Sequence, residues 1–188
     1  MLMRYDVQLQ TMIKAMVETV MPAVDPLNVP AQEQSRLVIG TLMLMAEQLP
    51  VQYQCDRNEL AGMIAFAEEI ASCLAGCSGT IAEALSGLTA TAHSANTLLS
   101  RPGADPADLL AMARAIRSEL DLVIDVTFTE DEAQAWRADV ANIVLTQSQN
   151  DILRQRVWAR SQGFEPADDL PSIESLATPS NSQLVTND

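Results

Sequence analysis

The sequence predicts an all-α protein, a single bundle of six or seven helices. Hydrophobic residues make up 48% of the 188 positions, yet aromatic residues contribute only 4%. Alanine, leucine and methionine fill the difference, and these residues favour helices over strands. Apolar residues also recur every three or four positions along most of the chain, as they do on one face of a helix.

The first helix is expected from about Asp6 to Met21. Its apolar stripe consists of Met12, Ile13, Met16, Val17 and Val20. Pro22 is expected to end this helix, because a proline disfavours the helical conformation of the residue before it. The proline-rich segment at residues 25–30 then predicts a connection.

The second helix is expected over residues 30–49, with Pro50 ending it. Between Leu37 and Met45, only Gly40 and Thr41 are not hydrophobic. A helix that is apolar on all sides is normally surrounded by other elements, so this segment is predicted to be the central helix. Its apolar run is too short for a bilayer, which needs about 20 residues.

The starts of the later helices are predicted from capping signals. Three segments have capping-box spacing and predict the third, fourth and sixth helices: Asp56–Glu59, Thr80–Glu83 and Thr129–Glu132. Asp105 followed by Pro106 predicts the start of the fifth helix.

A break is expected near Ser148–Asn150. Asp151 and Arg154 would otherwise fall on the apolar face of the sixth helix. A short last helix is therefore predicted to follow, ending at about Ser161.

The composition changes after residue 162, so a bundle domain is predicted at 1–162 and a tail at 163–188. The tail contains three prolines and five acidic residues but no basic ones, which predicts disorder or loose attachment. The alternative is that its apolar residues dock on a groove of the bundle: Phe164, Leu170, Ile173 and Leu176.

The net charge of −14 argues against nucleic-acid binding, which needs basic residues at the phosphates. An anionic membrane surface is disfavoured for the same reason. The odd number of cysteines (Cys55, Cys73 and Cys77) and the lack of a signal-peptide pattern at the N-terminus predict a reduced, cytoplasmic protein.

No metal, cofactor or catalytic residue is predicted. The single histidine, His93, has no glutamate three positions before it, which excludes the usual di-iron pattern. Cys77 and Ser78 lie in a glycine turn before a helix start, where a thiol pKa can be lowered and an anion bound. A straight helix would place His93 roughly 20 Å from Cys77, so the turn is better explained as a helix connection.

One basic cluster stands out in this acidic chain: Arg154, Arg156 and Arg160, with Trp158. Arginines near a helix C-terminus can simply complement the helix dipole. They can also form an anion clamp for a phosphate, a carboxylate or an acidic partner. The third possibility is that the acidic residues of the tail, Glu165 to Asp169, fold back on them.

Five methionines on the first two helices suit an adaptable contact surface, although an ordinary core position explains any single one of them better, since methionine commonly fills gaps in cores: Met12, Met16, Met21, Met43 and Met45. The first hypothesis is therefore a non-catalytic interaction or accessory protein that associates with itself or with a protein partner. The second is a small-molecule binder with an apolar pocket between helices and an arginine clamp. The weakest is a hydrolase or transferase that uses Cys77 or Ser78.

The proline turn within Val17–Pro26, followed by the apolar helix at Arg36–Leu49, resembles a small class of bacterial helical proteins. These are uncharacterised proteins that accompany aminoglycoside-phosphotransferase-like kinases. The resemblance covers about residues 10–50 and carries no catalytic residue. It implies an accessory role beside an enzyme.

Overall fold

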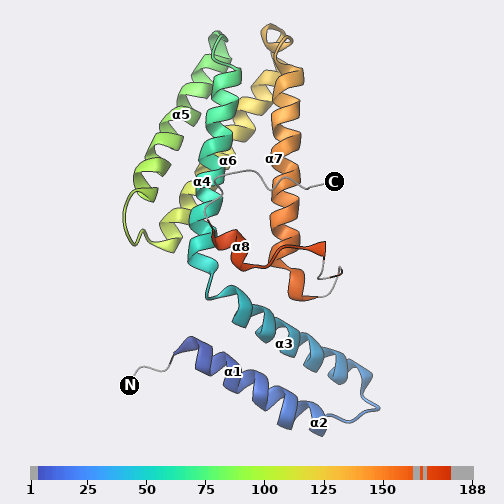
Figure 1. Cartoon of the computed structure of the whole chain (residues 1–188). Coiled ribbons are helices and arrows are strands. Elements are labelled where there is room, and N and C mark those ends of the chain that lie inside the picture. The colour runs from blue at the N-terminus through green and yellow to red at the C-terminus, as the bar shows by residue number, and fades with distance from the viewer. Residues whose placement is uncertain (1–3, 163–165, 167–168, 179–188) are drawn as a thin grey trace. The chain divides into compact units, whose positions relative to one another are not determined.

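The computed structural model describes residues 4–162, 166 and 169–178 (Figure 1), and these residues contain helices and no strand. The predicted all-α class is confirmed. The chain divides into two compact units, which we call the N-terminal unit (Met1–Gln52 and Gln155–Ser175) and the bundle unit (Tyr53–Arg154 and Leu176–Asp188). The predicted domain at 1–162 contributes to both units, so residue 162 is not one of the boundaries.

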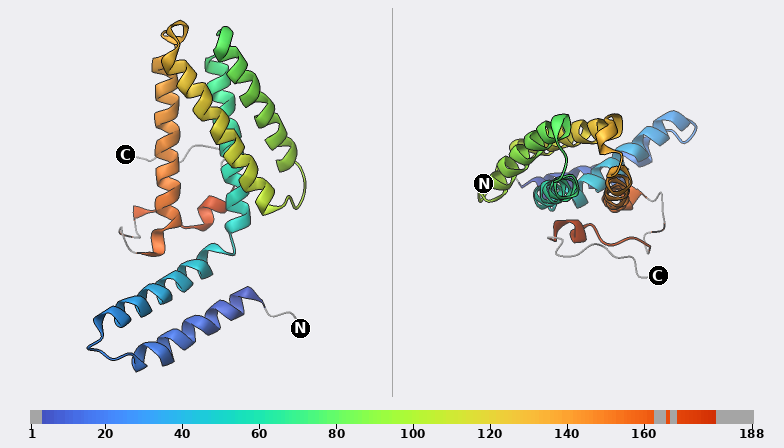
Figure 2. Two further views of the ribbon diagram at one scale, coloured as in Figure 1. Left: turned by 180° about the vertical axis from the view of Figure 1, so that it is seen from behind. Right: turned by 90° about the horizontal axis from the view of Figure 1, so that it is seen from above.

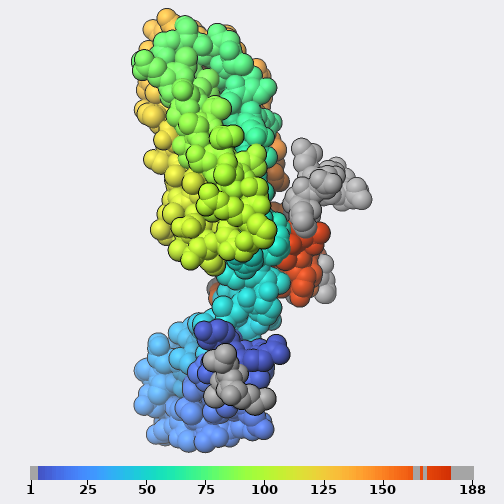
Figure 3. Space-filling view, turned by 90° about the vertical axis from the view of Figure 1, so that its left-hand side faces the viewer, coloured from blue at the N-terminus to red at the C-terminus, as the bar shows by residue number. Residues whose placement is uncertain are grey.

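The N-terminal unit is built on a helical hairpin. Its first arm comprises α1 (Tyr5–Ala15), the π-helix η1 (Met16–Val20) and α2 (Met21–Ala23), and its second arm is α3 (Val29–Gln48). The two arms lie side by side and run antiparallel (Figure 2). In the space-filling view, α1 in dark blue and α3 in lighter blue form a continuous surface (Figure 3).

Pro22 does not end the first arm, which stays helical to Ala23. The N–H of Met21 donates to the carbonyl of Met16, five residues back, as in a π-helix. This wider turn lies directly before Pro22, which has no N–H to donate and whose ring clashes with a carbonyl of a regular helix. The π-helix therefore lets the chain pass the proline without stopping.

The connection between the two arms is fixed by side-chain hydrogen bonds. Asn28 caps α3, because its Oδ1 accepts from the N–H of Ala31 at 3.2 Å. Gln32 donates through Nε2 to the carbonyl of Val24 at 2.9 Å. Pro30 lies in the first turn of α3, so the predicted start and end of this helix are each within one residue of those observed.

No residue of α3 is buried, so the prediction that this is the enclosed central helix is wrong. An apolar surface on all sides of a helix indicates that something should cover it. It does not indicate that the cover belongs to the same chain.

The bundle unit holds the main hydrophobic core. Its helices are α4 (Gln52–Cys73), α5 (Gly79–Leu99), α6 (Pro106–Thr129), the 3₁₀ turn η2 (Asp131–Ala133) and α7 (Arg137–Trp158), with Gln52 and the last four residues of α7 assigned to the N-terminal unit. Buried residues from all of these elements form one cluster. The α5 and α6 helices share the most extensive contact.

The capping prediction at Asp105 is confirmed, but the capping boxes are less reliable. Asp105 Oδ1 accepts from the N–H of Ala107 at 2.8 Å, with Pro106 in the first turn. In contrast, α4 already begins at Gln52, four residues before Asp56. Arg57 and Asn58, in its first two turns, each donate to a carbonyl distant in the sequence.

The box at Thr80 predicts the start of α5 to within one residue but supplies no cap, whereas the box at Thr129 does not open a helix. The residue before α5 is Ser78, whose side chain makes no capping bond, and Gly79 has a φ of 62°. Only glycine adopts this value readily, so the turn geometry fixes the start of α5. Thr129 ends α6 instead of opening a helix, because its hydroxyl donates to the carbonyls of Asp125 and Val126.

The α7 helix is continuous, and the break predicted near Ser148–Asn150 is absent. Its polar residues are accommodated individually. Gln147 donates through Nε2 to Asp151 Oδ1 at 2.9 Å. Arg154 lies beside Gly62 of α4, with Nη1 3.6 Å from where a Cβ on that glycine would stand, so the missing side chain leaves room for the guanidinium.

The described part of the tail is packed. Leu170 and Leu176 are buried, and residues 174–177 form the short helix α8 (Glu174–Ala177). Asn58 Nδ2 donates to the carbonyl of Leu176 at 2.8 Å. Of the four apolar residues expected to dock, Leu170 and Leu176 are therefore buried and Ile173 is half-buried, whereas Phe164 lies outside the described residues.

None of the helices in the described part of the chain combines the length and the apolar character that crossing a membrane requires.

Candidate interaction surface

Large apolar side chains are exposed along the whole hairpin. Among residues 4–52, only Leu9 is buried. Of the 18 large hydrophobic residues exposed in the described chain, 12 lie in this segment. They are Tyr5, Val7, Met12, Val17, Val20, Leu27, Val29, Leu37, Val38, Met43, Met45 and Leu49. On a normal protein surface, exposed hydrophobic residues are scattered singly. Here they are concentrated on the hairpin.

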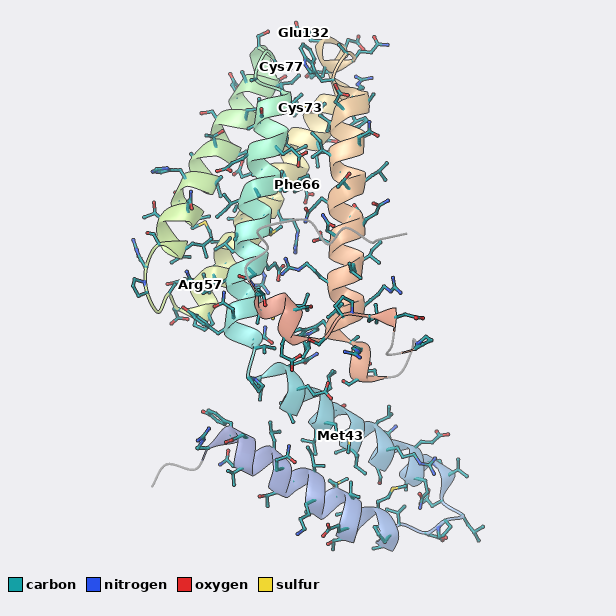
Figure 4. The ribbon with its side chains drawn as sticks, viewed as in Figure 1. Met43, Arg57, Phe66, Cys73, Cys77 and Glu132 are labelled. Atoms are coloured by element: carbon teal, nitrogen blue, oxygen red, sulfur yellow. The ribbon has the colours of Figure 1, made fainter. Side chains whose placement is uncertain are left out.

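The five methionines singled out in the sequence divide into two groups. Met12, Met43 and Met45 are exposed, so the core interpretation is wrong for them. Met16 and Met21 are half-buried. Figure 4 marks Met43 on α3.

One side of the hairpin is apolar, and no charged residue of α3 lies on it. We call it the uncharged face and define it by Tyr5, Met12, Val38, Met45 and Leu49. Tyr5 and Met12 are seven residues apart, as are Val38 and Met45, so each pair shares one side of its helix. The helices α1 and α3 run antiparallel. Two side chains therefore lie on the same face of the hairpin when each is rotated around its own helix in the same direction, starting from the contact between the helices.

The charged residues of α3 point elsewhere. At about 100° per residue, Glu33, Arg36 and Glu47 lie about 140° or more around the helix from Val38. On the other arm, Lys14 forms an ion pair with Glu18, with Nζ and Oε2 3.8 Å apart, and Lys14 lies about 160° from Met12.

Charge is also distributed unevenly along the sequence. Residues 1–52 contain three basic and five acidic residues, whereas residues 53–188 contain eight basic and twenty acidic ones. Most of the negative charge is therefore carried outside the hairpin.

The four residues of the predicted arginine cluster have different surroundings. Arg160 donates through Nη1 to the carbonyl of Pro171 at 3.4 Å. Its charge also contributes, after hydrogen bonds from the Glu174 backbone and from Ser172, to a lowered pKa of the Glu174 carboxyl. The tail therefore does fold back on one arginine, but through residues 171–174. The acidic residues predicted for this contact, Glu165 to Asp169, lie mostly outside the described residues.

The other members of the cluster have separate surroundings. Arg154 belongs to the bundle unit and lies beside Gly62. Trp158 is half-buried in the N-terminal unit, and its carbonyl accepts from Gln48 Nε2 at 3.0 Å. Arg156 is exposed in the same unit.

Two arginines that the sequence analysis did not single out have clear structural roles. Arg57 donates through Nη2 to the carbonyl of Leu99, at the end of α5, at 2.5 Å. Arg137 donates through Nε to the carbonyl of Thr127 and through Nη2 to that of Glu130, at 3.0 and 2.9 Å. Both guanidinium groups thus bond to carbonyls at helix ends, where intrahelical donors run out; the carbonyl of Glu130 also accepts from the N–H of Ala133 at 3.1 Å.

The thiols near the α4–α5 turn are not activated. Burial raises the pKa of Cys73, helped by the negative charge of Asp139, and burial with Glu132 raises that of Cys77. Cys73, Cys77 and Glu132 lie at the same end of the bundle unit (Figure 4). The raised pKa of both thiols is opposite to the lowered thiol pKa considered from the sequence. His93 is exposed on α5.

Alkylation of Cys73 and Cys77 by iodoacetamide at neutral pH is therefore expected to be slower than alkylation of an unperturbed cysteine in a peptide. Only the thiolate reacts, and a raised pKa lowers its fraction. The pKa of each thiol is higher in the folded protein than the unfolded value of 9.0. The free energy of unfolding therefore keeps its full value below pH 9.0 as far as these thiols are concerned, and it decreases as the pH rises through the folded pKa. Mass spectrometry of the alkylated peptides checks this, and reaction faster than in the peptide would contradict it.

No three or more His, Cys, Asp or Glu side chains come together as a possible metal site in the parts of the chain that the structure describes.

Comparison with protein-family models, with curated proteins and with solved structures finds no match to this chain. The resemblance of residues 10–50 to kinase-associated helical proteins thus stays an expectation.

Proposed function

We propose that this protein is a non-catalytic interaction protein whose N-terminal hairpin binds another protein chain. The observation that supports this most directly is α3, whose residues 37–45 are almost all apolar and which has no buried residue. Burying apolar surface is favourable by about 25 cal/mol per Å². Binding a partner would bury the apolar surface that the hairpin leaves exposed, and this burial would favour binding.

The difference in burial between the bundle unit and the hairpin supports the same proposal. The bundle unit carries a buried cluster that draws on α4, α5, α6 and α7. The hairpin buries only Leu9, so its apolar residues are explained less well by a core than by contact. Methionine, which accounts for three of the exposed residues, adapts readily to a partner surface.

The cytoplasm is the compartment we propose. All three cysteines are free, as is usual where thiols are kept reduced. An accessory role beside an enzyme, as the resemblance implies, would supply one kind of partner.

Native mass spectrometry of the full chain, purified gently from its source, tests the proposal. We expect the protein to carry an additional protein mass, either a second copy or another chain. A variant with Leu37→Gln, Val38→Gln and Met45→Gln should lose that mass. The matched control, Leu110→Gln with Leu122→Gln on α6, changes two leucines that are each 50% exposed and should retain it.

Two results would contradict the proposal. One is a bare monomer for the unmodified chain. The other is loss of the associated mass from the α6 control to the same extent as from the hairpin variant.

A further inference from the structure

We propose that the partner of the uncharged face is a second copy of the same chain, and that two hairpins form an antiparallel four-helix bundle. This inference rests on the proposed function and names its partner. Two antiparallel helices supply half of such a bundle, and a two-fold axis supplies the other half from the same surface.

The spacing on α3 is that of a helix–helix seam. Val38, Leu42, Met45 and Leu49 follow one another at intervals of four, three and four residues, as apolar residues do along a coiled-coil seam. Leu42 is half-buried and the other three are exposed. The seam therefore runs along one edge of the contact between α3 and α1 and is left open on the outside.

The charge distribution favours a copy of the hairpin over an oppositely charged partner. None of the five residues that define the uncharged face is acidic or basic, and the nearest charges, Arg4 and Asp6, pair with each other at 3.3 Å. Two such faces meet without repulsion, because the charged residues of α3 lie on the far side of the helix. A patch that contacts itself across a two-fold axis must be self-complementary in this way.

The exposed side chains of this face define what a dimer would have to bury. Five exposed side chains, Tyr5, Met12, Val38, Met45 and Leu49, form the face together with the uncharged residues between them. A standard interface takes about 800 Å² from each partner, so a stable dimer must bury these five side chains together with the residues between them.

Neighbouring methionines of α3 provide a matched test. Met45 lies on the uncharged face and Met43 lies about 160° around the helix from it. Their exposed fractions are nearly equal, 41% for Met45 and 45% for Met43. Met45→Glu and Met43→Glu therefore make the same chemical change at similar exposure on one helix.

Sedimentation velocity on the full chain, from low to high micromolar concentration, is the measurement. We expect the unmodified chain and Met43→Glu to form dimers with similar dissociation constants. Met45→Glu should raise the dissociation constant at least about 30-fold, since two glutamates enter a desolvated contact. Circular dichroism is expected to show the same helical content in all three proteins.

Three results would overturn the inference. These are a monomeric unmodified chain at every concentration, dimers of Met45→Glu as tight as those of the unmodified chain, and equal dissociation of both variants. The proposed function would survive the first result if native mass spectrometry still found a different protein bound to the chain and lost only from Met45→Glu. If no associated mass is found either, both the inference and the proposed function are wrong.

Discussion

Replacing Leu88 by alanine is expected to lower the free energy of unfolding by about 2–5 kcal/mol. Leu88 is fully buried on α5 and belongs to the central cluster of the bundle unit. Truncation removes buried methyl groups and leaves a cavity that close-packed neighbours fill only in part. Urea denaturation monitored by circular dichroism measures the change.

The control for this prediction is the same truncation on α3. Leu37 is 61% exposed, so Leu37→Ala is expected to change the free energy of unfolding by no more than about 0.5 kcal/mol. A loss at Leu37 as large as that at Leu88 would show that α3 is enclosed after all.

Replacing Arg137 by alanine is expected to cost about 1–3 kcal/mol, because two carbonyls at the end of α6 then lose a charged donor. The two hydrogen bonds, to Thr127 and Glu130, come from different nitrogens of one guanidinium group. Arg137→Lys keeps the charge but lacks this fork, so it should recover only part of the loss. Thermal and urea unfolding of the three proteins gives the comparison.

Equal stability of Arg137→Ala and the unmodified chain would contradict this role. Full recovery by lysine would show that charge near the helix end, rather than the paired hydrogen bonds, is what stabilises this corner.

Hydrophobic periodicity predicts the helices of this protein better than capping motifs predict where they start. The stripe containing Ile81, Leu88 and Ala95 is buried as its spacing indicates. Asp56 and Thr80 have capping-box spacing, yet both lie inside helices. A capping box describes only local hydrogen bonds, and here the positive φ of Gly79 decides where α5 begins.

The break expected in α7 shows a second limit. Asp151 and Arg154 disturb the apolar pattern, but Gln147 and Gly62 accommodate them without interrupting the helix. For Arg154, the compensating residue is Gly62, which belongs to another helix. The hydrophobic periodicity of a single segment contains no information about such a residue.

The candidate surface could be found only in part from the sequence. Met12 and Met45 were singled out for their residue type, whereas Tyr5, Val38 and Leu49 were not. The available signal was seven-residue spacing combined with the absence of charge on one side of each helix. Periodicity alone does not separate an internal contact from an external one, which is why α3 was expected to be buried.

Oxidation of methionines by hydroxyl radicals, read by mass spectrometry of the full chain, tests the central claim most directly. Met63 in the core of the bundle unit is buried and serves as the internal reference. In dilute, dissociated protein, Met12, Met43 and Met45 should all oxidise much faster than Met63. In associated protein, Met12 and Met45 should become protected while Met43 stays reactive. Equal reactivity of Met43 and Met45 in protein of confirmed associated mass would contradict an interface on the uncharged face of the hairpin.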